Sequence, residues 1–378
     1  MKKVFILTGE PSGDKLASRV IRNLQKQNLN IEYLCVGGEN LKAIGIKSLY
    51  DLKEITYLGF TKVFLNLFAI NIKINKTVKA VIEFNPDILF TVDSPDFTLR
   101  VAERVKKKNP KIKTVHYVAP QVWAWREGRV KKIKNFIDHI LLLFSFEKEY
   151  FNKEQINSEF VGHPLLEDKE LEDVDLKQII GKKKALISIF AGSRISEINM
   201  LTPILLNFIK LMKVKYNDIT YIFHSTKENN KLLNSYIVSS GLLNCMVVSD
   251  DNTKAHILRK SIFAVSKSGT VSLEICNAKI PSIIFYKTGF INFLILKLLV
   301  KTKYVNIINI AAKKKIIPEL LQKDCTAENI YKHVNNFLDN PDKIKIQITN
   351  IEKILNTLKT NKPSSELASN FLNKILYS

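Results

Sequence analysis

Short apolar runs alternate with amphipathic segments along almost the whole chain. Lys3–Thr8 is an apolar run, the loop Gly9–Asp14 follows it, and Lys15–Gln27 has the apolar spacing of a helix. Similar runs predict five more strands in the first part of the chain, at Ile31–Val36, Asp87–Val92, Thr114–Val118, His139–Phe144 and Glu159–Val161. Continuous apolar strands between helices indicate a parallel sheet that helices cover on both faces.

The alternation stops in a charged segment and then begins again. Pro164–Gly181 is charged and lacks a strand pattern, so we place a domain boundary at residue 170. After Pro318 the chain is mostly helical in pattern, and before it further strands are predicted at Ala185–Phe190, Thr220–His224, Met246–Val248, Ile262–Val265 and Ser282–Phe285. We therefore predict an α/β protein of two Rossmann-like, doubly wound parallel-sheet domains that face a central cleft, 1–170 and 171–378. The prediction leaves open whether the last helices pack back on the first domain.

Composition narrows the class of protein. A chain of 378 residues is too long for one core, and its apolar fraction of 46% is ordinary for a globular protein. The net charge of +22 favours an anionic partner, although biased base composition also enriches lysine. The longest apolar run, Phe290–Val300, contains Lys297 and is too short to span a bilayer, so we expect a soluble or peripheral protein.

No metal site or disulfide framework is expected. The cysteines are far apart, without CxxC spacing, and the six histidines are scattered. The pair Asp173 and Asp175 resembles a metal-nucleotide ligand, but it lies in the charged linker and not at a strand end.

Ser266–Tyr286 has the pattern strand, glycine turn, helix, strand. A helix that begins after Ser268, Gly269 and Thr270 presents unpaired N–H groups at the carboxyl end of the sheet, where a diphosphate fits. Glu274 lies one turn into that helix and is placed to accept hydrogen bonds from two ribose hydroxyls. The alternative is an ordinary βαβ unit, in which the glycine only makes the turn.

A second turn in the same half ends in an arginine. Ser193 and Arg194 follow the predicted strand Ala185–Phe190, and a helix opens directly after them. An arginine at this place neutralises a leaving diphosphate through paired hydrogen bonds. The alternative is a surface arginine, and we favour the functional interpretation.

Two turns in the first half carry polar groups at strand ends. Gly13 lets the backbone of the loop Gly9–Asp14 approach a ligand closely, and Ser12 fits either helix capping or a substrate contact. Asp93 and Asp96 follow the strand Asp87–Val92, where one carboxylate is placed to act as a general base. A turn with an aspartate cap explains this pair equally well.

Two segments suggest lipid contact. Leu58–Phe84 is strongly apolar and contains several lysines, with Phe64 and Phe68 one helical turn apart and Leu65 beside them. This pattern fits either a membrane-surface helix or a core helix. Arg129 and Lys132 belong to a basic helical face that is either solvated or in contact with acidic headgroups.

Seven motifs spread over nearly the whole chain resemble the lipid-A-disaccharide synthase family, which consists of inverting glycosyltransferases of the GT-B architecture. They are TGEPSGD (Thr8–Asp14), DSPDF (Asp93–Phe97), HYVAPQVWAWREGRVKKI (His116–Ile133), FVGHP (Phe160–Pro164), AGSRISEI (Ala191–Ile198), SGTVSLE (Ser268–Glu274) and KTKYVNIINIAAKKKIIPELLQ (Lys301–Gln322). One departure is Lys313, which stands where the family usually has glycine.

The resemblance implies a specific reaction. UDP-2,3-diacylglucosamine and 2,3-diacylglucosamine 1-phosphate (lipid X) would give the β-1,6 lipid A disaccharide 1-phosphate and UDP, without metal or other cofactor. It implies Asp93 as the base with Asp96 second, Arg194 at the diphosphate, and a substrate-binding role for Asn309. It also implies a cytoplasmic, peripheral enzyme at the inner membrane of a Gram-negative bacterium, and leaves a homodimer open.

Two other functions compete with this one. Another UDP-sugar-dependent enzyme on the same fold, either a lipid glycosyltransferase or an epimerase, is the runner-up, and a soluble epimerase would not need the greasy segment Leu58–Phe84. A nucleic-acid-binding protein ranks far lower, because the chain has no recognition-helix, RNA-binding or zinc signature.

Overall fold

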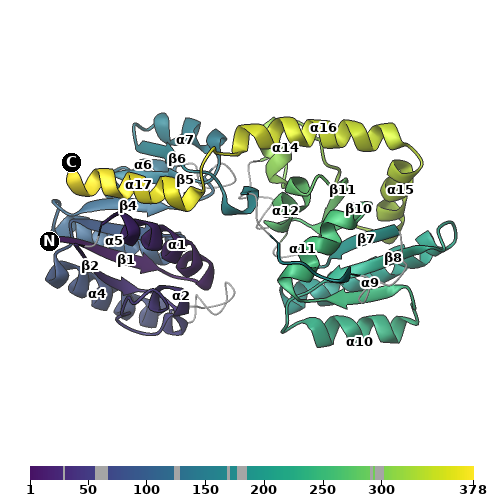
Figure 1. Ribbon diagram of the computed structural model, residues 1–378, viewed down its shortest axis with the longest axis horizontal. Helices are drawn as coiled ribbons and strands as arrows, with labels where there is room; N and C mark the ends of the chain where they lie inside the picture. The colour runs from purple at the N-terminus through teal and green to yellow at the C-terminus, as the bar shows by residue number, and fades with distance from the viewer. Residues whose placement is uncertain are drawn as a thin grey trace. The chain divides into compact units, whose positions relative to one another are not determined.

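The computed structural model describes residues 1–28, 30–55, 67–122, 128–167, 171–176, 185–289, 293 and 302–378 (Figure 1). The chain forms two compact units, the first from Met1–Pro164 with Thr360–Ser378 and the second from Leu165–Lys359. The chain therefore leaves the first unit after Pro164, six residues before the expected boundary at 170, and its last segment returns to that unit.

The first unit is built on a six-stranded parallel sheet with the order β2-β1-β3-β4-β5-β6. The six strands predicted in this part of the chain are confirmed, with small shifts in their ends. They are β1 (Lys2–Thr8), β2 (Ile31–Val36), β3 (Ile88–Val92), β4 (Lys113–Tyr117), β5 (His139–Leu142) and β6 (Asn157–Phe160).

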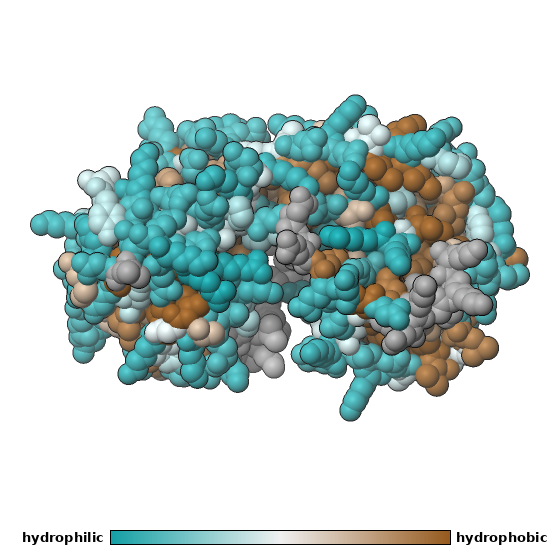
Figure 2. All heavy atoms as spheres, viewed as in Figure 1, coloured by the Kyte–Doolittle hydropathy of each residue, from teal (hydrophilic) through white to brown (hydrophobic). Residues whose placement is uncertain are grey.

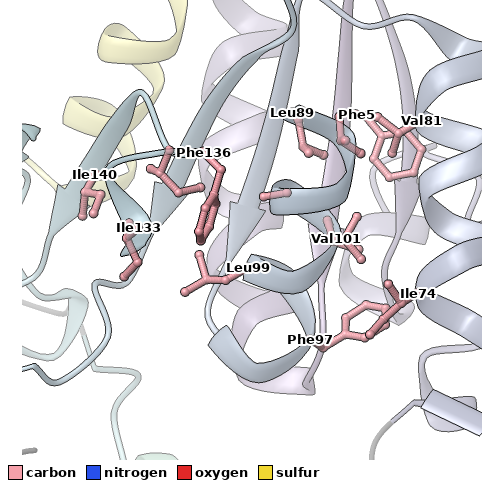
Figure 3. Close-up of a cluster of buried hydrophobic side chains, with 14 of the residues drawn as sticks. Phe5, Ile74, Val81, Leu89, Phe97, Leu99, Val101, Ile133, Phe136 and Ile140 are labelled. Atoms are coloured by element: carbon pink, nitrogen blue, oxygen red, sulfur yellow. The ribbon is translucent and has the colours of Figure 1, made fainter. Parts of the chain in front are cut away.

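Helices cover this sheet and bury its apolar side chains. Phe5 of β1, Leu89 of β3, Val81 and Val101 are fully buried in one core, and Figure 3 shows this cluster between the sheet and two helices. The helices and turns are α1 (Pro11–Gln27), α2 (Glu39–Lys42), η1 (Leu52–Glu54), α4 (Leu67–Phe84), α5 (Pro95–Lys108), α6 (Arg129–Ile133), η2 (Ser145–Glu147), α7 (Lys148–Asn152) and α17 (Ser364–Tyr377).

The C-terminal helix α17 packs along α1, far away in the sequence (Figure 1). The Nδ2 atom of Asn28 donates to Oδ1 of Asn373 at 2.6 Å, and Gln27 Nε2 donates to Asn370 Oδ1 at 2.6 Å. The preceding long helix, α16 (Pro341–Leu358), remains in the second unit.

The second unit has its own six-stranded parallel sheet, ordered β12-β11-β10-β7-β8-β9. The five strands predicted here are confirmed. A sixth, β12, pairs with β11 at the sheet edge and was not predicted, because three residues are too few to show a strand pattern. The strands are β7 (Ala185–Phe190), β8 (Ile219–His224), β9 (Cys245–Val248), β10 (Phe263–Lys267), β11 (Ser282–Tyr286) and β12 (Glu319–Leu321).

Helix α9 (Ile195–Lys213) fills the core of the second unit. Among the described helices it is the one whose length and composition would suit a membrane span, but Leu205, Phe208 and Ile209 are buried against the sheet. We interpret α9 as a core helix. The other helices and turns are η3 (Pro164–Leu166), α10 (Asn230–Ser240), α11 (Asp251–Lys260), α12 (Val271–Asn277), α14 (Ile307–Ala312), η4 (Gln322–Asp324) and α15 (Ala327–Leu338).

Hydrophilic side chains cover most of the face shown in Figure 2, with hydrophobic side chains visible between them. This distribution agrees with the lysine-rich composition and with cores that lie inside each unit.

Candidate functional site

Each sheet has one point where the order of its strands reverses, and ligands of doubly wound folds bind beyond the carboxyl ends of the strands at such a point. In the second unit the point lies between β7 and β10, because β8 and β9 continue on the other side of β7. The predicted residues Ser193 and Arg194 follow β7, and Ser268–Thr270 follow β10. The two predicted phosphate-binding turns are therefore neighbours at this switch point.

A carboxylate of the following helix, that of Glu197, stabilises the turn after β7. Glu197, in the first turn of α9, accepts a hydrogen bond from the backbone N–H of Ser193 at 3.3 Å. Gly192 has φ +110°, and a Cβ atom there would lie 2.5 Å from Glu197 Oε2. Only glycine combines this backbone conformation with so close an approach. Asn229 adds a second support by donating to the carbonyl oxygen of Ser193 at 2.7 Å.

Glu197 also joins the two turns through charge. Its Oε1 atom lies 3.3 Å from Nη1 of Arg194 and 3.0 Å from Nζ of Lys267, the last residue of β10. Burial raises the pKa of Glu197, but Lys267 and Arg194 lower it, and the net shift is downward. The carboxylate therefore stays ionised between two cations, and the side chain of Arg194 is 76% exposed.

The glycine turn after β10 leads into the short helix α12. Gly269 and Thr270 are exposed, whereas the hydroxyl of Ser268 donates to the carbonyl oxygen of Val305 at 3.3 Å. Glu274 lies in the first turn of α12 and is half-buried. The turn thus faces solvent with its glycine and threonine, and its serine ties it to the segment before α14.

Asn309 is fully buried, and protein groups occupy its whole side-chain amide. Its Oδ1 atom accepts the backbone N–H groups of Ile316 and Ile317 at 2.7 and 2.9 Å. Its Nδ2 atom donates to the carbonyl oxygen of Ile317 and to Glu319, both at 2.8 Å. Glu319 in turn accepts the backbone N–H of Asn306 at 2.9 Å. This geometry favours a role in shaping the loop around α14 over direct substrate contact.

In the first unit the switch point lies between β1 and β3, and it brings Ser12 and Asp93 together. The hydroxyl of Ser12 donates to Oδ2 of Asp93 at 3.3 Å, and the backbone N–H of Ser94 donates to Oδ1 at 2.8 Å. A Cβ atom on Gly13 would lie 3.0 Å from the carbonyl oxygen of Val92, so the glycine permits close packing of the first turn of α1 against the end of β3. Helix α1 begins at Pro11, so the expected loop Gly9–Asp14 is shorter than predicted.

The backbone at this corner is left-handed without glycine. Asp93 and Ser94 have φ of +55° and +44°, a conformation that costs an ordinary L-residue roughly 1–2 kcal/mol. Such strain persists where the surrounding structure holds it, and it is found often at functional sites. Asp96 is exposed in the first turn of α5, where the helix dipole stabilises a carboxylate.

Asp14 has a structural role in the same unit. It is almost fully buried and accepts the backbone N–H groups of Gly38 and Asn40 at 2.7 and 2.9 Å. It therefore anchors the turn after β2 and the start of α2.

The predicted lipid contacts are only partly visible. Phe64 and Leu65 lie outside the described residues, and Arg129 belongs to α6 although its side chain is not described. Lys132 is exposed. Phe68 of α4 is 79% exposed, and Ile72, one turn further along the helix, is 51% exposed.

Sequence reasoning missed the charged residues that hold the predicted site segments in place. Glu197, Lys267 and Glu319 each contact a predicted segment, and each lies inside or beside a quoted motif. The sequence contained one usable signal for these contacts. Glu197 is three residues after Arg194 at the start of a helix, a spacing at which two side chains can form an ion pair.

Comparisons with known proteins find one family whose members match nearly the whole chain. The model of the family described as lipid-A-disaccharide synthetase matches residues 4–375. The lipid-A-disaccharide synthase of Rickettsia bellii is 36% identical over 382 residues, which cover 98% of each chain. That of Rhodospirillum centenum is 30% identical over 379 residues, covering 98% of this chain and 94% of the relative.

Solved structures share the fold at low sequence identity. The S. aureus MnaA–UDP co-structure has a TM-score of 0.66 at 14% identity and covers 100% of this chain and 96% of its own. UDP-GlcNAc 2-epimerase from Neisseria meningitidis bound to UDP-GlcNAc has a TM-score of 0.64 at 15% identity, covering 100% of both chains. The spinosyn rhamnosyltransferase SpnG complexed with thymidine diphosphate has a TM-score of 0.59 at 11% identity, covering 99% of this chain and 100% of its own. The chain therefore has the two-domain GT-B-like fold that epimerases and transferases share.

Proposed function

The chain belongs to the lipid-A-disaccharide synthetase family, and on that premise we propose that it condenses UDP-2,3-diacylglucosamine with lipid X. It is a glycosyltransferase of lipid A disaccharide synthesis, with a UDP-sugar and a lipid as its classes of substrate. The observation that carries the specific reaction is the family match over residues 4–375, together with 36% identity to a relative across 98% of both chains.

The proposed reaction inverts the anomeric carbon in one displacement. The 6-hydroxyl oxygen of lipid X attacks that carbon, the bond from the carbon to the diphosphate oxygen breaks, and its electron pair leaves with UDP. Asp93 takes the hydroxyl proton. Its carboxylate suits this task because Ser12 and the Ser94 N–H orient both of its oxygens. Asp96 is the second candidate for the base.

The departing diphosphate takes up negative charge, and the second unit offers positive charge for it. Arg194 is exposed and shares its carboxylate partner with Lys267, so its guanidinium is available to a diphosphate at modest cost. The exposed turn of Gly269 and Thr270, with Ser268 and Ser193, would contact the phosphates. Glu274 would accept the ribose hydroxyls. The protein groups supply this charge in our proposal, which therefore needs no metal.

We place the enzyme at the cytoplasmic face of the inner membrane as a peripheral protein, either as a monomer or as a homodimer. Phe68 and Ile72 give α4 an exposed apolar edge, on a chain with net charge +22. Apolar burial and attraction to anionic lipid act together in such docking. Cosedimentation with anionic vesicles tests this point: Phe68→Ser with Ile72→Ser should release the protein, and unchanged binding would contradict it.

The reaction itself is tested by UDP release from UDP-2,3-diacylglucosamine in detergent micelles, with and without lipid X, in excess EDTA. Release that depends on lipid X and survives EDTA is the expected result. Release without lipid X would indicate hydrolysis or another acceptor. Conversion of UDP-GlcNAc to its 2-epimer, without lipid, would favour the epimerase activity named for the structural neighbours.

A further inference from the structure

Lys267 lies where the two predicted phosphate-binding turns meet, and it has no part of its own in the proposed reaction. It ends β10 directly before Ser268, and its side chain is only 19% exposed. Its Nζ atom lies 3.0 Å from Glu197 Oε1 and 5.5 Å from the ring centroid of Tyr286. An aromatic face and a carboxylate therefore fix this ammonium group in place.

The carboxylate of Glu197 serves three partners at once. It accepts the Ser193 N–H at 3.3 Å, pairs with Lys267 at 3.0 Å and pairs with Arg194 at 3.3 Å. Lys267 is largely buried, whereas Arg194 is 76% exposed. We therefore expect the largely buried Lys267 to stay paired with Glu197 when a ligand binds, and the exposed Arg194 to exchange Glu197 for the ligand.

A diphosphate near this turn brings two or more negative charges toward Glu197. An unneutralised carboxylate there would repel the ligand and would hold Arg194 for itself. Among the described residues, the titratable and charged groups that face Glu197 are Arg194, directly before its helix, Lys267 on β10 and Tyr286 on β11. Of these, Lys267 alone is a cation held away from solvent.

We infer that Lys267 is a positioning residue for diphosphate binding. Resting on the proposed function, its task is to neutralise Glu197, so that this carboxylate orders the Gly192–Arg194 turn while the Arg194 guanidinium stays free for the diphosphate of a UDP-sugar. Lys267 acts through Glu197 and does not contact the ligand.

The test is the dissociation constant of UDP, measured by calorimetry on the full chain. Lys267→Met keeps the unbranched stem of the side chain and removes its charge, and it should weaken UDP binding by about 10-fold or more, as expected for one lost charged interaction. Lys267→Arg should stay within about threefold of the wild type, because it keeps the charge. Lys210→Met, at an exposed lysine near the far end of α9, is the matched control and should change nothing.

A double variant separates positioning from direct contact. Adding Glu197→Gln to Lys267→Met removes the uncompensated carboxylate and leaves an amide oxygen to accept the Ser193 N–H. Most of the lost UDP affinity should therefore return. If the double variant is as weak as Lys267→Met, then the lysine contacts the diphosphate itself and the inference fails.

The pH dependence gives an independent signature. In Lys267→Met the main cause of the low pKa of Glu197 is gone, so burial raises that pKa. As the pH falls, Glu197 takes up a proton in the variant before it does so in the wild type. The variant then no longer carries an unneutralised carboxylate, so the difference in UDP affinity between variant and wild type should narrow. A gap that stays constant with pH, or a Lys267→Met variant that loses only thermal stability, would overturn the inference. If the wild type itself does not bind UDP, then the proposed function fails, and the role of Lys267 fails with it.

Discussion

The two switch points of this protein hold their candidate catalytic side chains in different ways. In the first unit, Asp93 and Ser94 carry left-handed backbone at the candidate base itself. At the switch point of the second unit, the left-handed backbone after β7 is at a glycine, Gly192, and the nearby cation, Arg194, lies on extended backbone with φ −98°.

This difference separates a group fixed by backbone from one held by charge. A general base must keep one direction toward its proton, and a strained corner with two hydrogen bonds to the carboxylate gives that direction. A cation for a departing diphosphate must move with its ligand. A long exposed side chain, loosely paired with Glu197, allows such movement.

The largest expected effect is at the base. Asp93→Asn keeps the shape of the side chain and an oxygen that accepts hydrogen bonds, but it cannot take a proton. We expect kcat to fall by about 10²–10⁴-fold with little change in Tm. Initial rates of UDP release, with a thermal melt of the same preparation, measure both quantities.

Asp96→Asn is the matched control for that variant, since it removes a carboxylate three residues away on the exposed first turn of α5. It should retain most of the activity. If Asp93→Asn turns over at nearly the normal rate and Asp96→Asn does not, then the roles of the two aspartates are reversed.

Arg194→Ala should rank next. Removing one charged donor from a developing oxyanion costs about 10²–10³-fold in kcat. Because the side chain is mostly exposed, the loss should appear without a change in the free energy of unfolding. Arg194→Lys should recover little, since an ammonium cannot make paired hydrogen bonds to a diphosphate. Normal turnover in Arg194→Ala would remove this residue from the mechanism.

Asn309→Ala should act on stability. The change leaves two backbone N–H groups and one carbonyl without the side-chain partner that they have in the unit, and each unsatisfied buried group costs about 1–3 kcal/mol. Glu319 loses one donor but keeps the N–H groups of Val305 and Asn306. The free energy of unfolding in urea should therefore fall by at least ~2 kcal/mol. Asn234→Ala is the control, because the bonds of that exposed asparagine within the described residues go to Asn230 on its own helix. If Asn309→Ala is fully stable but binds UDP poorly, then the side chain serves the substrate.

The sequence was informative about the fold because buried parallel strands appear as continuous apolar runs, which give their positions directly. The edge strand β12 was missed, since it is too short to have a period. Helix α17 shows the same limit: its amphipathic pattern predicts a helix, but nothing local indicates that it packs along α1 in the first unit.

For the candidate sites, sequence located the turns but not the contacts between them. Strand ends followed by glycine, serine and charged residues mark loops at the carboxyl edge of a sheet. The pairing of Glu197 with Lys267 joins residues 70 positions apart, so it depends on strand order. Likewise, the partners of the Asn309 amide lie in the segment after α14, and only the three-dimensional structure shows that this segment folds back onto the side chain.

The smallest expected effect tests whether left-handed backbone matters away from the first unit's corner. Lys313 ends α14 with φ +50°. Lys313→Gly should raise stability by up to ~1 kcal/mol, or about 2–4 °C in Tm, without changing UDP release. Gly241→Lys is the reverse control, because this glycine ends α10 with φ +68° and a Cβ atom there would meet open space. It should lower Tm by a similar amount. A Lys313→Gly variant that loses activity would mean that the second unit, too, keeps strained backbone for its function.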